Sequence, residues 1–173
     1  QAQYLASHLE VLELPVLEVV MAVLYLVFGE TTWIVRIILS VCWCLGGWFI
    51  YQIGKRHFSP WAAISVLFFY LFVPLGVMAS RAFQPDAWMI TWVLLSYLMV
   101  YRYLEEDSWK NAILAGLAAG WALMVKPTAV IYVGPVYLAL MLDHYGIKEF
   151  WRKGKVWVIA GLALVPVTVY SLF

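Results

Sequence analysis

The feature that most constrains this chain is its series of long apolar runs, which are broken only by short polar stretches. Hydrophobic residues make up 65% of the 173 residues, charged residues only 12%, and the mean hydropathy is +0.88. A soluble domain carries about a quarter charged residues and roughly half apolar ones. A core of this size could not hide so much apolar surface from water, so lipid must cover the rest. The sequence therefore predicts an all-α membrane protein.

A bilayer core about 30 Å thick needs roughly 20 apolar residues per helix, with a range near 17–25. Six runs reach or approach this length: 33–53, 60–80, 86–104, 111–125, 128–142 and 156–173. The fourth and fifth are shorter, and only Lys126 and Pro127 separate them from each other. We expect a polytopic bundle of about six spans over 33–173.

A further apolar stretch, 14–28, is too short for a confident span and contains Glu18. Leu17, Met21, Leu24 and Phe28 recur at helical spacing. We expect this stretch to form a helix at the outer membrane surface, within a juxtamembrane segment 1–32 that packs on the bundle.

Basic residues orient the spans. Eight lie in one set of alternate loops and three in the other: Lys55, Arg56, Arg102, Lys110, Lys148, Arg152, Lys153 and Lys155 against Arg36, Arg81 and Lys126. Cytoplasmic loops carry the excess of lysine and arginine, so the larger set is predicted to be cytoplasmic. The sequence thus predicts a multi-pass protein of the plasma (inner) membrane. Its net charge of +1 gives no indication of nucleic-acid binding.

The chain lacks an initiating methionine and stops within an apolar stretch. We therefore expect it to be part of one longer transmembrane domain, with parts missing upstream and downstream.

Charged groups near the membrane core are costly, so those on the predicted outer side are candidate functional residues. Lys126 ends a short span next to Pro127, where irregular backbone must line a cavity or the protein interior. A lysine there suits an anionic group such as a phosphate, although it could equally snorkel to the surface. The glycines of Gly116-x-x-x-Gly120, by contrast, indicate close helix packing.

Two other outer segments carry polar residues. Arg81 could bind a phosphate, and Asp86 could hold a metal or neutralise Arg81; a solvated loop ion pair is the alternative. His8, Glu10 and Glu13 could serve as metal ligands or as an acid/base set, but their spacing fits no strong metal motif, and a solvated entry to a helix is the alternative. Arg36 could pair with Glu30 or face the same cavity. No cofactor follows with certainty, and a divalent metal stays open.

The order of several short motifs resembles a known family. Phe28-Gly29-Glu30 precedes Trp33-Ile34-Val35-Arg36; the loop Ser80-Arg81-Ala82-Phe83-Gln84-Pro85-Asp86 and a helix ending in Leu123-Met124-Val125-Lys126 follow. This order resembles the GT-C membrane glycosyltransferases, in the branch of the dolichyl-phosphate-mannose protein mannosyltransferases and lipid A aminoarabinose transferases.

The resemblance implies a GT-C-like bundle that moves a sugar from a polyprenyl-phosphate carrier to an extracytoplasmic protein, lipid or glycan. It implies that Lys126 binds the donor phosphate, that Asp86 lies near that phosphate or a metal, and that Glu13 is the acidic residue before the proline-led segment. A leaving phosphate needs positive charge and an acceptor needs a base, so the chemistry agrees.

The chain departs from the family at one position. The usual catalytic aspartate of the first outer loop has no counterpart before His8, so we expect the chain as it stands to be incomplete for catalysis. A transporter or flippase segment, with Lys126-Pro127 as a broken-helix site, and a non-catalytic membrane scaffold are the alternative functions.

Overall fold

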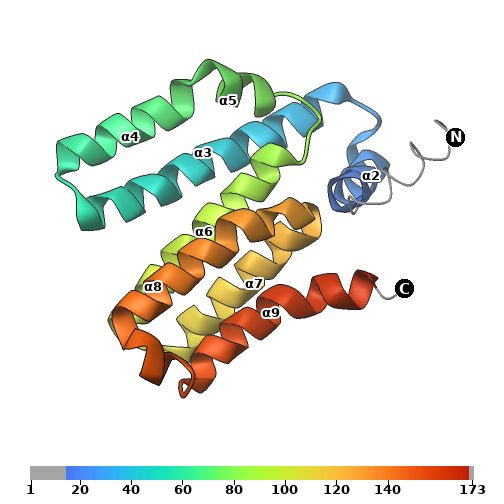
Figure 1. The fold of residues 1–173 in the computed structure, drawn as a ribbon. Helices are drawn as coiled ribbons and strands as arrows, with labels where there is room; N and C mark the ends of the chain where they lie inside the picture. Colours follow the sequence, from blue (N-terminus) through green and yellow to red (C-terminus); the bar gives the residue numbers. More distant parts are fainter. Residues whose placement is uncertain (1–14, 172–173) are drawn as a thin grey trace, which may run out of the picture.

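A computed structural model describes residues 15–171, and these residues form an all-helical bundle (Figure 1). In chain order the long helices are α3 (Thr32–His57), α6 (Asp86–Glu106), α7 (Trp109–Val125), α8 (Val130–Phe150) and α9 (Gly154–Ser171). The short helix α2 (Val16–Phe28) precedes them, and α4 (Pro60–Phe72) and α5 (Pro74–Ala79) lie between α3 and α6. This confirms the predicted helical bundle.

The helices of the bundle run up and down, which gives it two ends (Figure 1). We call the end where α3, α6 and α8 begin the Lys126 end. We call the end where α4, α7 and α9 begin the Arg56 end. The helix α2 is seen end-on beside the Lys126 end, so it lies across the direction of the bundle, as expected for a helix at a membrane surface. Its side chains Leu17 and Met21 are buried against Val35 and Leu39 of α3.

Three helices among the described residues are long and apolar enough to cross a membrane: Thr32–His57, Asp86–Glu106 and Pro127–Phe150. The remaining predicted spans correspond to shorter apolar helices, which are α4 followed by α5, α7 and α9. The fifth run is longer than predicted because residues 143–150, beyond its predicted end at 142, continue α8. Gly146 interrupts the helical conformation there with a φ of 69°.

The second predicted run, 60–80, is also not one continuous helix. Val73 lies before Pro74, and the ring of a proline disfavours helical backbone in the residue before it. Val73 accordingly has φ −59° and ψ 126°, and α5 restarts with Pro74 in its first turn. The break redirects the chain toward the loop that contains Arg81.

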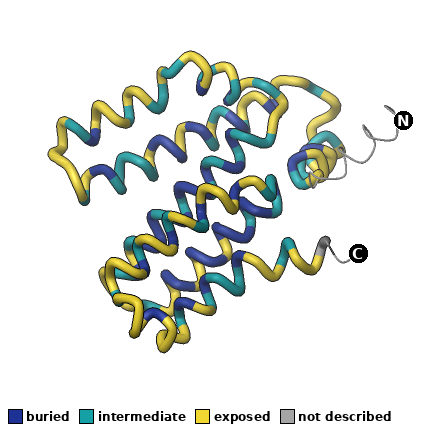
Figure 2. Tube along the Cα trace, in the orientation of Figure 1, coloured by how far each residue is buried: buried dark blue, intermediate teal, exposed yellow. Residues whose placement is uncertain are grey.

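The core lies between α6, α7 and α9, where burial is greatest (Figure 2). α7 can approach α9 closely because it carries small residues on one face. A Cβ added at Gly120 would lie 2.5 Å from the Leu162 carbonyl oxygen, and one at Gly116 would lie 2.8 Å from the Leu162 Cβ. This close contact confirms the packing face predicted from the two glycines.

Candidate functional site

Two prolines place the charged residues of the candidate site at helix ends. Pro85 immediately precedes α6, so Asp86 occupies the first turn of that helix. Pro127 follows Lys126 and keeps it extended, with φ −152° and ψ 113°, which ends α7. A negative charge in a first turn is favourable because the helix N-terminus carries partial positive charge. Local sequence thus positions both side chains at the Lys126 end.

Lys126 and Asp86 contact each other although 40 residues separate them in the sequence. The Lys126 Nζ donates a hydrogen bond to the Asp86 Oδ1 across 3.0 Å. The two side chains are 23% and 38% exposed, so the pair is partly shielded yet accessible. The suggestion that Asp86 neutralises Arg81 was wrong, because its carboxylate pairs with Lys126 instead.

Arg81 lines a different feature, a groove between α3 and α5. The groove has a volume of about 830 Å³ and is bordered by Arg36, Ser40 and Arg81 together with apolar side chains. Neither arginine makes a side-chain ion pair within residues 15–171. Arg36 therefore faces this groove and does not pair with Glu30. Two guanidinium groups on one open groove make it strongly basic.

His8 and Glu13 lie outside the described residues, so their predicted roles remain predictions. Among residues 15–171, no group of three or more His, Cys, Asp or Glu side chains could hold a metal ion. Of the predicted site residues, the structure brings Asp86 and Lys126 together and puts Arg81 on the neighbouring groove with Arg36.

Sequence reasoning missed the partnership of Asp86 with Lys126. The available signal was the matched arrangement of Pro85 before Asp86 and Pro127 after Lys126, which puts opposite charges at the ends of adjacent helices. Such a pair has an evident chemical use, because an ammonium held by a carboxylate has a fixed position from which it can bind an anion.

Comparison with protein families finds one match. The family model described as dolichyl-phosphate-mannose-protein mannosyltransferase matches residues 13–172, which include every candidate discussed above except His8. No curated protein and no solved structure matches the chain.

Proposed function

Because the chain belongs to the dolichyl-phosphate-mannose-protein mannosyltransferase family, whose members are membrane glycosyltransferases, we propose that it moves a sugar from a polyprenyl-phosphate donor to an acceptor outside the cytoplasm. The observation that carries this proposal is the ion pair of Lys126 and Asp86 at the end of the bundle. This ion pair is predicted to lie on the extracytoplasmic side, because the eight basic residues assigned to cytoplasmic loops lie at or near the opposite end of the bundle.

In this proposal the Lys126 ammonium contacts the donor phosphate. The bond from the sugar to the phosphate breaks with negative charge growing on the phosphate oxygens, and a positive group fixed beside them stabilises that charge. Asp86 holds the ammonium at 3.0 Å, so the lysine does not have to be ordered when the donor binds.

Arg81 is the second proposed phosphate-binding residue, on the groove that it shares with Arg36. A guanidinium can offer two parallel N–H groups to a phosphate. We assign the acceptor's base to none of the described residues, because Asp86 is already engaged by Lys126. The resemblance implies an aspartate in a first outer loop for that role, and Glu13 stays a candidate acidic residue.

The test uses the full reading frame, expressed in membranes and supplied with a panel of polyprenyl-phosphate sugars. Release of polyprenyl phosphate reports transfer. Lys126→Ala is expected to lower kcat/KM by about 10²–10³-fold, as for the loss of one donor to a developing anion. The matched control is Lys155→Ala, since Lys155 is 19% exposed and pairs with Asp107 at 2.9 Å at the Arg56 end.

Lys155→Ala is expected to change kcat/KM by less than about threefold, because partly exposed ion pairs contribute little. Wild-type turnover in Lys126→Ala would remove Lys126 from the site. If the wild-type protein releases no polyprenyl phosphate from any donor in the panel, the proposed function itself is wrong.

A further inference from the structure

A groove with a volume of about 570 Å³ lies between α6 and α7 and begins at the Arg56 end. Its lining follows one stripe on each helix: Trp92, Leu95, Met99 and Arg102 on α6, and Lys110, Leu114, Leu117 and Trp121 on α7. Residues three or four apart share one face of a helix, so each stripe is continuous. The ring centroids of the two tryptophans are 5.8 Å apart. The groove is therefore basic at one end, apolar along its length and aromatic at the other end.

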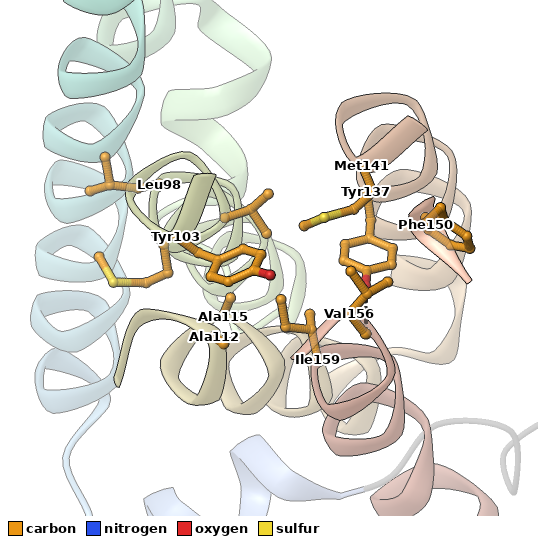
Figure 3. Packing of buried hydrophobic residues seen from close by; sticks show 11 residues of the cluster. Leu98, Tyr103, Ala112, Ala115, Tyr137, Met141, Phe150, Val156 and Ile159 are labelled. Carbon is orange, nitrogen blue, oxygen red and sulfur yellow. Dashed lines mark hydrogen bonds between the residues drawn. The ribbon is translucent and has the colours of Figure 1, made fainter. Parts of the chain in front are cut away.

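The groove lies on the side of α7 that faces away from the bundle. Ala112 and Ala115, on the other side of this helix, belong to the buried cluster that includes Tyr103 of α6 (Figure 3). Leu114 and Leu117 of the groove are 41% and 51% exposed. The apolar stripe of α7 is thus open to the surroundings of the described part of the chain.

The two cations of the groove have no counter-ion. Arg102 and Lys110 make no side-chain ion pair within residues 15–171. The acidic residues that follow Arg102 in the sequence have other partners: Glu106 accepts a hydrogen bond from the Asn111 amide at 2.7 Å, and Asp107 pairs with a lysine of α9 at 2.9 Å. Asn111 also donates to the Arg102 carbonyl at 3.4 Å, which fixes the end of α6 against the start of α7. Two adjacent cations are therefore left to bind an anion.

The start of α7 adds to this positive charge. A helix N-terminus is partly positive, so an acidic residue or a capping side chain stabilises it. The first turn of α7 has no acidic residue, and no side chain caps it. Lys110 lies in that turn instead. This arrangement costs helix stability unless an anion binds beside it.

The length of the groove matches one leaflet of a bilayer. Trp92 and Arg102 are ten residues apart on α6, and Lys110 and Trp121 are eleven apart on α7, which corresponds to about 15–17 Å of helix. Half of a hydrocarbon core about 30 Å thick is about 15 Å. With the two cations at the level of the lipid headgroups, the two tryptophans lie near the midplane of the bilayer.

We propose that this groove binds one anionic phospholipid of the leaflet at the Arg56 end. Its phosphate contacts Arg102 and Lys110, and one acyl chain follows the apolar stripes to the two tryptophans. Charge complementarity selects the headgroup, because a lipid with a net negative charge matches two cations and a zwitterionic lipid does not. Basic pockets between membrane helices on the cytoplasmic side bind anionic headgroups, and this end is predicted to be cytoplasmic. The site is opposite to Lys126 and does not depend on the proposed function.

Native mass spectrometry of the full-length protein, extracted in mild detergent and titrated with phosphatidylglycerol, measures the affinity for one bound lipid. Arg102→Gln with Lys110→Gln is expected to weaken that affinity about thirtyfold, because each cation near anionic lipid contributes about a factor of five. The matched control is Lys148→Gln with Arg152→Gln, which removes one lysine and one arginine at the same end but outside the groove. It should change the affinity by less than about twofold.

Phosphatidylcholine should bind the wild-type protein about as weakly as phosphatidylglycerol binds the groove variant. Equal losses of affinity in the two double variants would overturn the proposal, because a general effect of surface charge would then explain the binding. Equal affinities of the wild-type protein for the two lipids would overturn it as well.

A second measurement locates the acyl chain in the wild-type protein. Phosphatidylglycerol with a diazirine at the end of one acyl chain should crosslink to peptides that contain Trp92 or Trp121, and excess unlabelled phosphatidylglycerol should remove these crosslinks. If only polyprenyl phosphate removes them, the groove holds the sugar carrier and the proposal is wrong. Crosslinks spread over all helices, or absent from these two peptides because protein covers the groove, would also contradict it.

Discussion

The two ends of the bundle use similar charged residues in different ways. At the Arg56 end, Arg56 contacts Glu105 at 2.8 Å and Lys155 contacts Asp107 at 2.9 Å, and the two carboxylates are 51% and 64% exposed. These contacts join α3 to α6 and α9 to the turn after α6, at the end of the bundle where consecutive helices are connected by only two or three residues. At the Lys126 end, the carboxylate of the one described ion pair, Asp86, is less exposed, at 38%. Arg36 and Arg81 border a groove at this end, and neither arginine forms an ion pair within residues 15–171.

The charged residues in the ion pairs at the Arg56 end link helices to one another, whereas those at the Lys126 end are able to bind a ligand. The ion pairs at the Arg56 end have carboxylates that are more than half exposed, and exposed pairs contribute little stability. The Lys126 end has longer connections, interrupted by Pro74, Pro85 and Pro127. Irregular backbone near a membrane must border protein or a wet cavity, so this end is where the donor phosphate could be bound.

The largest expected effect comes from exchanging the charges of the pair at the Lys126 end. In the double variant Asp86→Lys with Lys126→Asp, the ion pair can form in reverse, so the amount of folded protein should recover relative to Asp86→Lys alone. Transfer should stay about 10²–10³-fold below wild type, because the ammonium no longer lies where the phosphate is bound. Protein level in membranes and polyprenyl phosphate release measure the two outcomes separately.

The same exchange at the Arg56 end provides the contrast. Arg56→Glu with Glu105→Arg should preserve both folding and transfer, because both residues lie in helical backbone and the pair is partly exposed. If the exchanged pair at the Lys126 end restores transfer, that pair is a helix connection like those at the Arg56 end, and the distinction between the ends fails.

Much of this fold could be predicted from the sequence. Apolar side chains are costly in water and unpaired backbone groups are costly in lipid, so few folds are possible for such a chain. The six runs, the surface helix and the glycine face all follow from composition and spacing. What escaped prediction depends on backbone details: the break at Val73 before Pro74, and the continuation of α8 past residue 142 with an interruption at Gly146.

The site was predictable as a set of residues but not as an arrangement. Charged side chains near the membrane core are costly and are therefore candidates for function, which singled out Arg81, Asp86 and Lys126. Their pairing depends on how α6 and α7 pack: Pro85 and Pro127 put opposite charges at helix ends, but they do not specify which ends meet across 40 residues. The apolar cavity between α8 and α9 could not be predicted either, since its lining residues look like ordinary lipid-facing or core positions.

The second prediction concerns α7, which connects the two ends. Gly120→Ala puts a Cβ 2.5 Å from the Leu162 carbonyl oxygen, so α7 and α9 must move apart. Overpacking of this kind costs about 1–3 kcal/mol. Gly161→Ala is the control, because a Cβ there meets nothing within 4 Å. Thermal unfolding in detergent should show a lower midpoint for Gly120→Ala alone; equal midpoints would mean that the close approach of α7 to α9 is not required.

The third prediction compares a basic groove at each end. Arg81 borders the groove of about 830 Å³ at the Lys126 end, and Arg102 borders one of about 570 Å³ between α6 and α7 near the Arg56 end. A hydrogen bond to a charged group is worth about 1.5–3 kcal/mol, so Arg81→Ala should raise the KM for the donor by about tenfold or more. Arg102→Ala should leave that KM within about twofold. Similar increases in both variants would indicate a general effect of surface charge on donor binding.

The smallest expected effect is at Glu105, the carboxylate that Arg56 contacts through two hydrogen bonds of 2.8 and 3.1 Å. Because Glu105 is 51% exposed, water and salt screen the pair, and Glu105→Ala should lower stability by about 1 kcal/mol or less. For a chain of this length that corresponds to a fall in Tm of about 2–4 °C at most. Transfer at a temperature well below Tm should be unchanged, since the pair lies at the end opposite to Lys126. Glu105→Gln, which keeps an acceptor for the guanidinium, should lose less stability than Glu105→Ala. A loss of transfer in Glu105→Ala with Tm unchanged would mean that the Arg56 end takes part in the reaction, because stability alone could not then account for the defect.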